Sequence, residues 1–310
     1  MKKFIILPDV TCDLSEEIRT RFGLEDYIEG YIHFSDGRDL KTTLDWSNIS
    51  REEFYKTLSN KKMEGSTAPA SPEDYYEFYK KYAEQGYDIL AMSISSKISS
   101  THNVAVGAAK RVMEEYPDCN IYCFDSLRMA GALGLLVIYA LQLKKDGKTM
   151  DEIIAWLEEY KHKVHQMGPI DDLIFVARRG RISMGKAIMG NFAGVKPMGD
   201  CNREGYVTVL TKAKGMNKAL ALSVEYARAV STDIENQYVL VSHSNRQTYA
   251  ETLADMVKKE LNPKDVFICD VFSGSGTNVG PGMVGLYFLG AEISEDLVNE
   301  KAIMAKLTEK

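Results

Sequence analysis

The sequence predicts an α/β protein of two domains, and three observations lead to this fold class. Apolar strand patterns alternate with helical patterns through the first half of the chain, which is typical of a doubly wound parallel sheet. After about residue 165 the pattern of residues changes, and the second half of the sequence contains a Gly-rich, basic stretch. A length of 310 residues corresponds to about two domains. We therefore expect a doubly wound N-terminal α/β domain over 1–165 and a C-terminal α/β domain with a mixed or antiparallel sheet over 166–310. The segment at about 55–75 is a candidate to pack with the other domain.

Each predicted element of the first domain has its own local signal. The run "DILAMSIS" is nearly continuously apolar, as expected for a strand with both faces covered. Ser50 with Glu53 forms a capping-box pattern, and Ser71-Pro72 is a helix-start signal. The predicted strands are 3–7, 27–34, 88–95 and 121–124, and the predicted helices are about 15–22, 51–59, from 71 onward, 101–115, 129–147 and 149 to about 165.

The second domain is read in the same way. "GYVTVLTKA" alternates as a strand does, and three further apolar runs have strand length. The predicted strands are 205–213, 237–243, 265–272 and 283–289, and the predicted helices are 215–230, 246–261 and the tail after 293.

Composition excludes several classes of protein. A formal net charge of -6 argues against a nucleic-acid binder, which would present a basic face. The longest apolar run, "AGALGLLVIYALQL", is too short to span a membrane and fits a buried helix, so we expect no stable membrane insertion. The start "MKKFIILPDV" is predicted to be a strand and not a signal peptide. Five cysteines without a CxxC pair indicate free thiols, and we expect a cytoplasmic protein.

Glycines and small hydroxyl residues gather in loops where a parallel sheet binds ligands, at the carboxyl ends of its strands. The segment "CDVFSGSGTNVGPGMVGLYFL" (269–289) places closely spaced glycines between two apolar runs, as if something approached the backbone there. Hydroxyl groups also cluster in "SISSKISST" (93–101), near Thr11 and at Ser66-Thr67. Where 99–101 pass from strand to helix, free N–H groups beside hydroxyls can hold an anion, although a single serine there can simply cap the helix.

Other chemistries have less support. The glycine segment matches neither nucleotide-binding glycine motif, and no histidine lies near it to serve a serine hydrolase. His162 and His165 are read as a solvated face of a polar helix and not as a metal site. Cys119 and Cys123 are read as packing residues. We therefore expect no metal, no cofactor and no catalytic residue.

Five segments, in order, resemble the DegV family of bacterial lipid-binding proteins, which includes the fatty-acid-binding subunits of fatty-acid kinase. Each segment is short, but together they match nearly the whole chain. They are "PDVTCDL", "TAPASP", "SSKISST", "RGRISMGKAIMG" with "VKP" downstream, and "NVGPGMVG".

This resemblance implies a long-chain fatty acid held in a tunnel between the two domains, with its carboxylate bound by hydroxyl groups. Thr67 and Ser99 fall in the family motifs that would bind the head group, and Asp9 would organise nearby hydroxyls. Arg181 would balance charge or dock a partner kinase. The candidate ligand-binding residues are Thr11, Thr67, Ser96, Ser99, Arg181, Asn278 and Gly280, and the expected apolar lining includes Met189, Phe192, Met283 and Tyr287.

The sequence departs from the family pattern at the head group. Asn278 stands where the family has a histidine, and asparagine can donate a hydrogen bond but cannot carry a positive charge. Three smaller departures are Val10, Ala68 and Ser100. We expect a non-catalytic protein that binds a fatty acid and presents it to a kinase subunit. The alternatives are a lipid-dependent regulator or adaptor without phosphoryl transfer and, with less support, a small-molecule enzyme.

Overall fold

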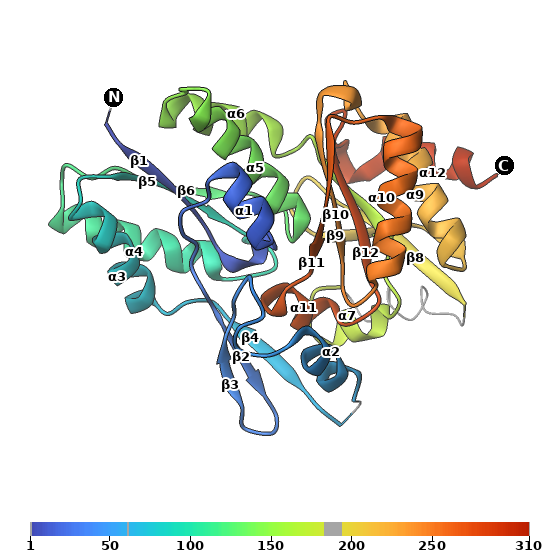
Figure 1. The fold of residues 1–310 in the computed structure, drawn as a ribbon, viewed down its shortest axis with the longest axis horizontal. Helices are drawn as coiled ribbons and strands as arrows, with labels where there is room; N and C mark the ends of the chain where they lie inside the picture. Colours follow the sequence, from blue (N-terminus) through green and yellow to red (C-terminus); the bar gives the residue numbers. More distant parts are fainter. Residues whose placement is uncertain (1, 61, 183–193, 310) are drawn as a thin grey trace.

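The computed structural model describes residues 2–60, 62–182 and 194–309, and within these ranges the chain forms three sheets flanked by helices (Figure 1). The α/β class and the two-domain organisation are as predicted, whereas the boundary at residue 165 stays a prediction.

The first domain is built on a parallel sheet in the order β1-β5-β6. Its strands are β1 (Phe4–Pro8), β5 (Asp88–Ser93) and β6 (Ile121–Asp125). Because side chains alternate along a strand, Ile5 and Leu7 pack on one side of the sheet and Ile6 on the other. The first side is covered by α3 (Pro72–Ala83) and α4 (Thr101–Glu115), and the second by α1 (Glu16–Phe22), α5 (Gly131–Lys145) and α6 (Met150–Tyr160). This is the doubly wound arrangement that the sequence predicts.

A small antiparallel sheet extends from the first domain toward the second. It has the order β3-β2-β4, with β2 (Tyr31–Phe34), β3 (Asp39–Lys41) and β4 (Gly65–Ala68), and α2 (Arg51–Ser59) packs beside it. The Tyr55 hydroxyl donates to the Val271 carbonyl at 2.6 Å, and the Trp46 indole donates to Asp270 at 2.8 Å. This extension therefore joins the two domains through hydrogen bonds.

The second domain contains a mixed sheet in the order β11-β10-β12-β7-β8-β9. Among its described neighbouring pairs, β10 and β11 are parallel and the others antiparallel, so of the two predicted kinds, mixed or antiparallel, the sheet is mixed. The strands are β7 (Val164–Pro169), β8 (Val195–Cys201), β9 (Val207–Lys214), β10 (Tyr238–His243), β11 (Asp265–Asp270) and β12 (Val284–Leu289). One face packs against α9 (Met216–Val230), α10 (Gln247–Leu261) and α12 (Val298–Thr308).

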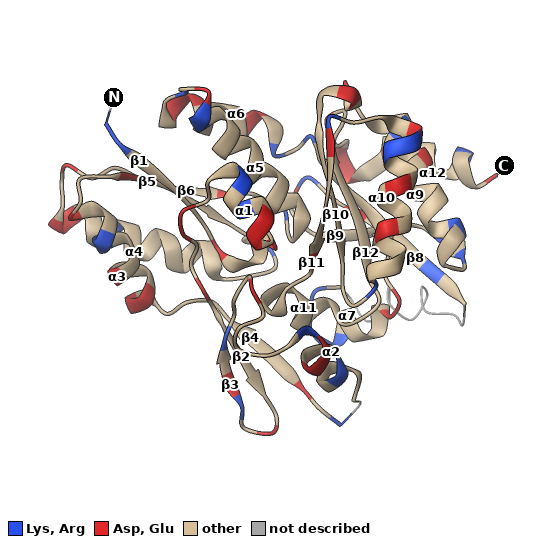
Figure 2. Cartoon of the chain, viewed as in Figure 1, with Lys and Arg blue, Asp and Glu red and all other residues tan. Residues whose placement is uncertain are grey.

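Helix α5 lies between the parallel β1-β5-β6 sheet and the six-stranded sheet, and it contacts β1 on one side and β7, β10 and β12 on the other. Its apolar side chains belong to one continuous core that includes Ile6 and Leu90 from the first domain and Leu240 and Tyr287 from the second. Figure 2 shows no charged residue along α5 before its carboxyl end, which agrees with an apolar run that is buried all round.

Two local predictions are wrong. The helix expected to continue to about 165 ends at Tyr160, and β7 begins at Val164. His165 consequently lies on a strand with no exposed surface, not on a solvated helix face, and His162 is half-buried.

The second error concerns the glycine segment, where residues expected to form a loop form the short helix α11 (Ser273–Val279). A Cβ atom at Gly276 would lie 2.8 Å from the Tyr55 hydroxyl and 2.9 Å from the Phe54 ring. The glycine is therefore needed for close packing of α11 against α2, and this packing overrides the low helix propensity of glycine.

Candidate functional site

A cavity of about 510 Å³ lies between the two domains, within the range of small-molecule sites. The first domain contributes the segment after β1, strand β4, the loop before α4 and the segment before α5. The second domain contributes β7, the short helix α7 (Leu173–Arg178), α11 and β12. Much of the wall is apolar, and its aliphatic members include Ile94, Ile98, Ile170, Leu173, Val176 and Met283.

The structure brings most of the predicted site residues to this cavity. Those that line it are Thr11, Thr67, Ser96, Ser99, Arg181 and Asn278, together with Met283 and Tyr287 of the predicted apolar lining. Gly280 is not among the lining residues; it ends α11 with φ 72°, and a Cβ there would lie 2.7 Å from the Phe175 ring. Met189 and Phe192 lie outside the described residues.

Thr67 and Asn278 meet across the two domains. Strand β4 carries Thr67, and the last turn of α11 carries Asn278. The Asn278 Nδ2 donates to Thr67 Oγ1 at 3.1 Å and to the Gly274 carbonyl at 3.4 Å. An amide and a hydroxyl thus stand side by side on the cavity wall, where both can bond to an oxygen-bearing ligand.

The loop between β5 and α4 presents hydroxyl groups and a helix N-terminus. Ser99 Oγ lies 2.7 Å from Thr101 Oγ1 and accepts from the Thr101 N–H at 3.3 Å. Ser100 stands at the N-cap of α4 but makes no side-chain cap hydrogen bond. The positive end of a 15-residue helix therefore faces the cavity, and it favours an anion.

Asp9 links two segments on this side of the cavity through hydrogen bonds. Its carboxylate accepts from the Thr11 N–H at 2.8 Å, from the Thr11 hydroxyl, and from the Ile94 N–H at 2.7 Å. Burial raises the pKa of Asp9 above its ordinary value, and these hydrogen bonds act in the opposite direction. As expected from the sequence, Asp9 organises a hydroxyl group.

Arg181 is a cation at the cavity wall. Its Nη1 donates to the Arg179 carbonyl at 2.6 Å, and no carboxylate within the described residues pairs with it. Partial burial lowers the pKa of Arg181 from its ordinary value. An acidic ligand in the cavity would supply the missing counter-charge.

Two lining residues escaped the sequence reasoning. Ser275 Oγ and Gln166 Oε1 are shielded from solvent, and Gln166 Oε1 has no hydrogen-bond partner in the described part of the chain. Ser275 belongs to the glycine segment and could have been singled out as a hydroxyl. No feature of the sequence indicated Gln166 as a lining residue, because a helix was expected to extend to about residue 165.

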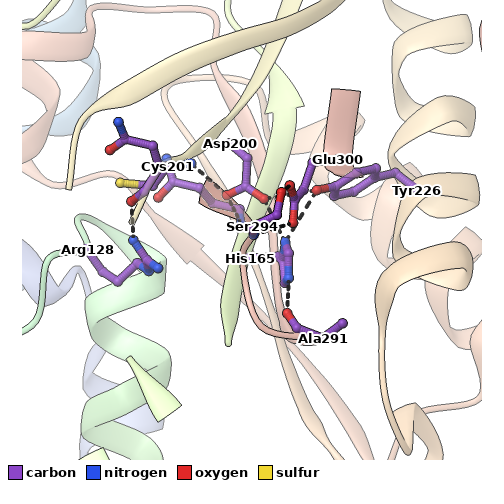
Figure 3. A network of polar contacts seen from close by, with 10 residues as sticks. Arg128, His165, Asp200, Cys201, Tyr226, Ala291, Ser294 and Glu300 are labelled. Atoms are coloured by element: carbon purple, nitrogen blue, oxygen red, sulfur yellow. Dashed lines mark hydrogen bonds and ion pairs between the residues drawn. The ribbon is translucent and has the colours of Figure 1, made fainter. Parts of the chain in front are cut away.

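Figure 3 shows a buried polar network around Asp200, whose Oδ1 accepts from the Gln166 N–H. His165 Nδ1 lies 2.8 Å from Asp200 Oδ2, and His165 Nε2 lies 2.8 Å from the Ala291 carbonyl. Tyr226 donates to the same Asp200 oxygen at 3.2 Å. Since neither His165 nor Asp200 has exposed surface, this network fixes the sheet and does not face a ligand.

Asp13 does not line the cavity, but it gives the stability of the protein a measurable pH dependence. Its Oδ1 accepts from the Phe272 N–H at 3.0 Å, its Oδ2 is shielded from solvent, and the hydroxyl of Ser275 lies close enough to act with Phe272 in lowering its pKa. Burial raises the pKa of Asp13 well above its ordinary range. The folded carboxyl group therefore keeps its proton to a higher pH than the unfolded one. The ordinary pKa of an aspartate, which applies to the unfolded chain, is about 4. As the pH rises from there through the raised pKa of the folded protein, the contribution of Asp13 to the free energy of unfolding falls.

We expect Asp13→Asn to remove this fall, because the amide keeps the acceptor for Phe272 but has no acidic proton. Urea unfolding of both proteins from about pH 4 to about pH 8 should show the difference in stability moving in favour of the variant. A difference that stays constant over this range would contradict a neutral Asp13 in the folded protein.

No group of three or more His, Cys, Asp or Glu side chains suited to a metal ion occurs within the described ranges. Among the same residues, no helix has both the length and the apolar character needed to cross a membrane.

Comparison with known proteins agrees with this geometry. A family model described as an uncharacterised protein of the DegV family matches residues 3–291. A DegV domain-containing protein of Clostridium perfringens is 33% identical over 293 residues, covering 94% of this chain and 98% of the relative. Among solved structures, a DegV lipid-binding protein from Thermotoga maritima has 26% identity and a TM-score of 0.80, covering 94% of this chain and 99% of its own. Another Thermotoga maritima protein, whose structure reveals a fatty-acid-binding function, has 25% identity and a TM-score of 0.80, covering 94% of this chain and 100% of its own. The chain therefore belongs to the DegV family.

Proposed function

We propose that this protein binds a long-chain fatty acid in the cavity between its domains, with the carboxylate at the hydroxyl-rich wall and the chain along the apolar wall. The observation that carries the proposal is the cavity itself, which combines an extensive aliphatic lining with the Thr67–Asn278 pair and the α4 N-terminus. The fatty-acid-binding function of one Thermotoga maritima relative supports it.

The energetics of this binding mode are sufficient without catalysis. Each buried methylene contributes about 0.8 kcal/mol, so about 15 methylenes contribute about 12 kcal/mol before the costs of ordering and association. The carboxylate is the costly part, because removing it from water requires full hydrogen bonding. Hydroxyl groups of Thr67 and Ser99, the Asn278 amide and the guanidinium of Arg181 would supply those bonds, and bonds to charged groups are the stronger ones.

The proposed role is to carry the fatty acid and present it to a partner kinase for formation of an acyl phosphate, since we assign no catalytic residue to the cavity. Thr11 and Ser96 would support the head group, Gly280 would shape the end of α11, and the domain boundary would lie near residue 165. The replacement of the family histidine by Asn278 favours a second candidate, a lipid-dependent regulator without phosphoryl transfer. A pull-down with a soluble kinase subunit, with and without loaded lipid, would separate the two roles.

Organic-solvent extraction of the recombinant protein is expected to release about one fatty acid per chain, because an empty apolar cavity between two domains is unfavourable in water. Mass spectrometry identifies and counts the lipid. Finding no stoichiometric lipid, even after delipidation and reloading, would refute the proposed function.

Ser99→Ala is expected to weaken fatty-acid binding by roughly tenfold, the effect of losing one hydrogen bond to a charged group. Ser93, at the end of β5, is buried but does not line the cavity, so Ser93→Ala is the matched control. Titration calorimetry with delipidated protein measures both affinities, and thermal unfolding reports any loss of the bond from Ser99 to Thr101. Equal affinities in the two variants would show that Ser99 does not bind the head group.

A further inference from the structure

We propose that Gln166 recognises a hydroxyl group on the hydrocarbon chain, so that the preferred ligand is a hydroxylated long-chain fatty acid. This inference rests on the proposed function and names a narrower class of ligand for the same cavity.

Gln166 lies on the cavity wall away from the Thr67–Asn278 pair. It is directly opposite Tyr287 in the antiparallel pair of β7 and β12, so the two side chains share a face of the sheet, and both line the cavity. Ile170, four residues further along the chain, packs with Val279 beside the same small core of α7. Four residues of strand correspond to about 13 Å, which separates Gln166 from the α11 end of the cavity.

The side chain of Gln166 is a polar group without a partner. Its amide makes no hydrogen bond to any residue that the structure describes, and its Oε1 is shielded from solvent. The neighbouring Tyr287 hydroxyl accepts from Ser242 at 2.9 Å, and it does not bond to Gln166 Oε1. Close by, Met129 and Ala130 contribute apolar surface to the cavity. An amide oxygen that is shielded from solvent in such surroundings is unfavourable unless a ligand or a water molecule bonds to it.

The strand holds Gln166 in this orientation. The Gln166 N–H donates to Asp200 Oδ1 at 3.0 Å, and Asp200 is itself held by His165 and Tyr226 in the network of Figure 3. Because neighbouring side chains on a strand point to opposite faces, the burial of His165 in that network directs Gln166 into the cavity. The backbone at Gln166 is therefore fixed, so its side chain enters the cavity from a defined point on the strand.

A hydroxyl group is the chemistry that matches this amide. Both groups donate and accept hydrogen bonds, so one hydroxyl can satisfy the amide in either orientation. A saturated hydrocarbon chain has no hydrogen-bond donor and no acceptor, so it would leave the Gln166 amide without a partner. A second carboxylate would need a positive charge, which Gln166 does not have. A site that hydrogen-bonds a ligand hydroxyl rejects the analogue that lacks it.

Competition between ligands tests the inference. Delipidated full-length protein would be mixed with equal amounts of octadecanoic acid and a monohydroxylated octadecanoic acid, for a series of hydroxyl positions, and the bound species counted by native mass spectrometry. We expect at least one hydroxylated isomer to be preferred by roughly tenfold, and Gln166→Leu to abolish that preference while still binding octadecanoic acid. Met167→Leu, a volume-conserving change at the next residue of β7, is the control and should keep the preference, because Met167 packs in the core on the other face of the sheet and does not line the cavity.

The outcomes separate this inference from the proposed function. If the wild-type protein binds octadecanoic acid and every hydroxylated isomer equally, a water molecule satisfies Gln166 and the inference is overturned, while fatty-acid binding stands. A preference that survives in Gln166→Leu would overturn the role of this residue. If neither kind of acid binds, the proposed function itself fails.

Discussion

Replacing Ile170 with tryptophan is expected to lower fatty-acid affinity by roughly two orders of magnitude while the protein remains folded. Ile170 lines the cavity at the point where β7 ends and the chain turns toward α7. An indole ring there would occupy space that the ligand needs and displace several methylenes. Losing about four methylene contacts at about 0.8 kcal/mol each corresponds to a decrease of about 200-fold in affinity.

Ile174→Trp is the matched control for this prediction. Ile174 lies on α7, packs against the same small core as Ile170 and does not line the cavity. Calorimetric titration of delipidated protein should show weak binding for Ile170→Trp and near wild-type binding for Ile174→Trp. If both variants bind as the wild type does, the ligand does not pass Ile170.

His165→Ala is expected to decrease the free energy of unfolding by about 3–5 kcal/mol, the range found when one partner of a buried charged pair is removed. The change would leave the Asp200 carboxylate without exposed surface and without its imidazole partner. Such a loss is a large fraction of the roughly 5–15 kcal/mol that stabilises a typical domain.

His33 provides the comparison, because it pairs with Asp39 at a similar distance on the surface. The two pairs have N–O distances of 2.8 and 2.7 Å, but the His33 and Asp39 side chains are 46% and 70% exposed. Urea unfolding at neutral pH should show a loss within about 1 kcal/mol for His33→Ala. Comparable losses in the two variants would mean that burial of the His165–Asp200 pair has no energetic consequence.

The elements that could be predicted from the sequence are those whose stability is largely local. Helix α4 occupies the predicted residues 101–115, and α5 follows from an apolar run that could only be buried. The cavity residues Thr67, Ser99 and Asn278 could be named because they stand in short motifs with a recognisable order.

The features that could not be predicted depend on partners far apart in the chain. His165 pairs with Asp200 and with Ala291, and nothing in the segment around 160–166 indicates either contact. With neither partner visible, a polar helix was the simpler interpretation, and Gln166 was missed with it. Helix α11 depends on the close contact between Gly276 and Tyr55, two residues that lie far apart in the sequence.

The position of α5 has a consequence for how a lipid reaches its site. This helix packs between the two sheets, so a hinge motion that separated the domains would remove it from its contacts with one sheet. Leucines such as Leu133 and Leu136 would then be exposed to water. We therefore expect a ligand to exchange through local displacement of peripheral segments, and we expect the two domains to unfold together as one cooperative unit.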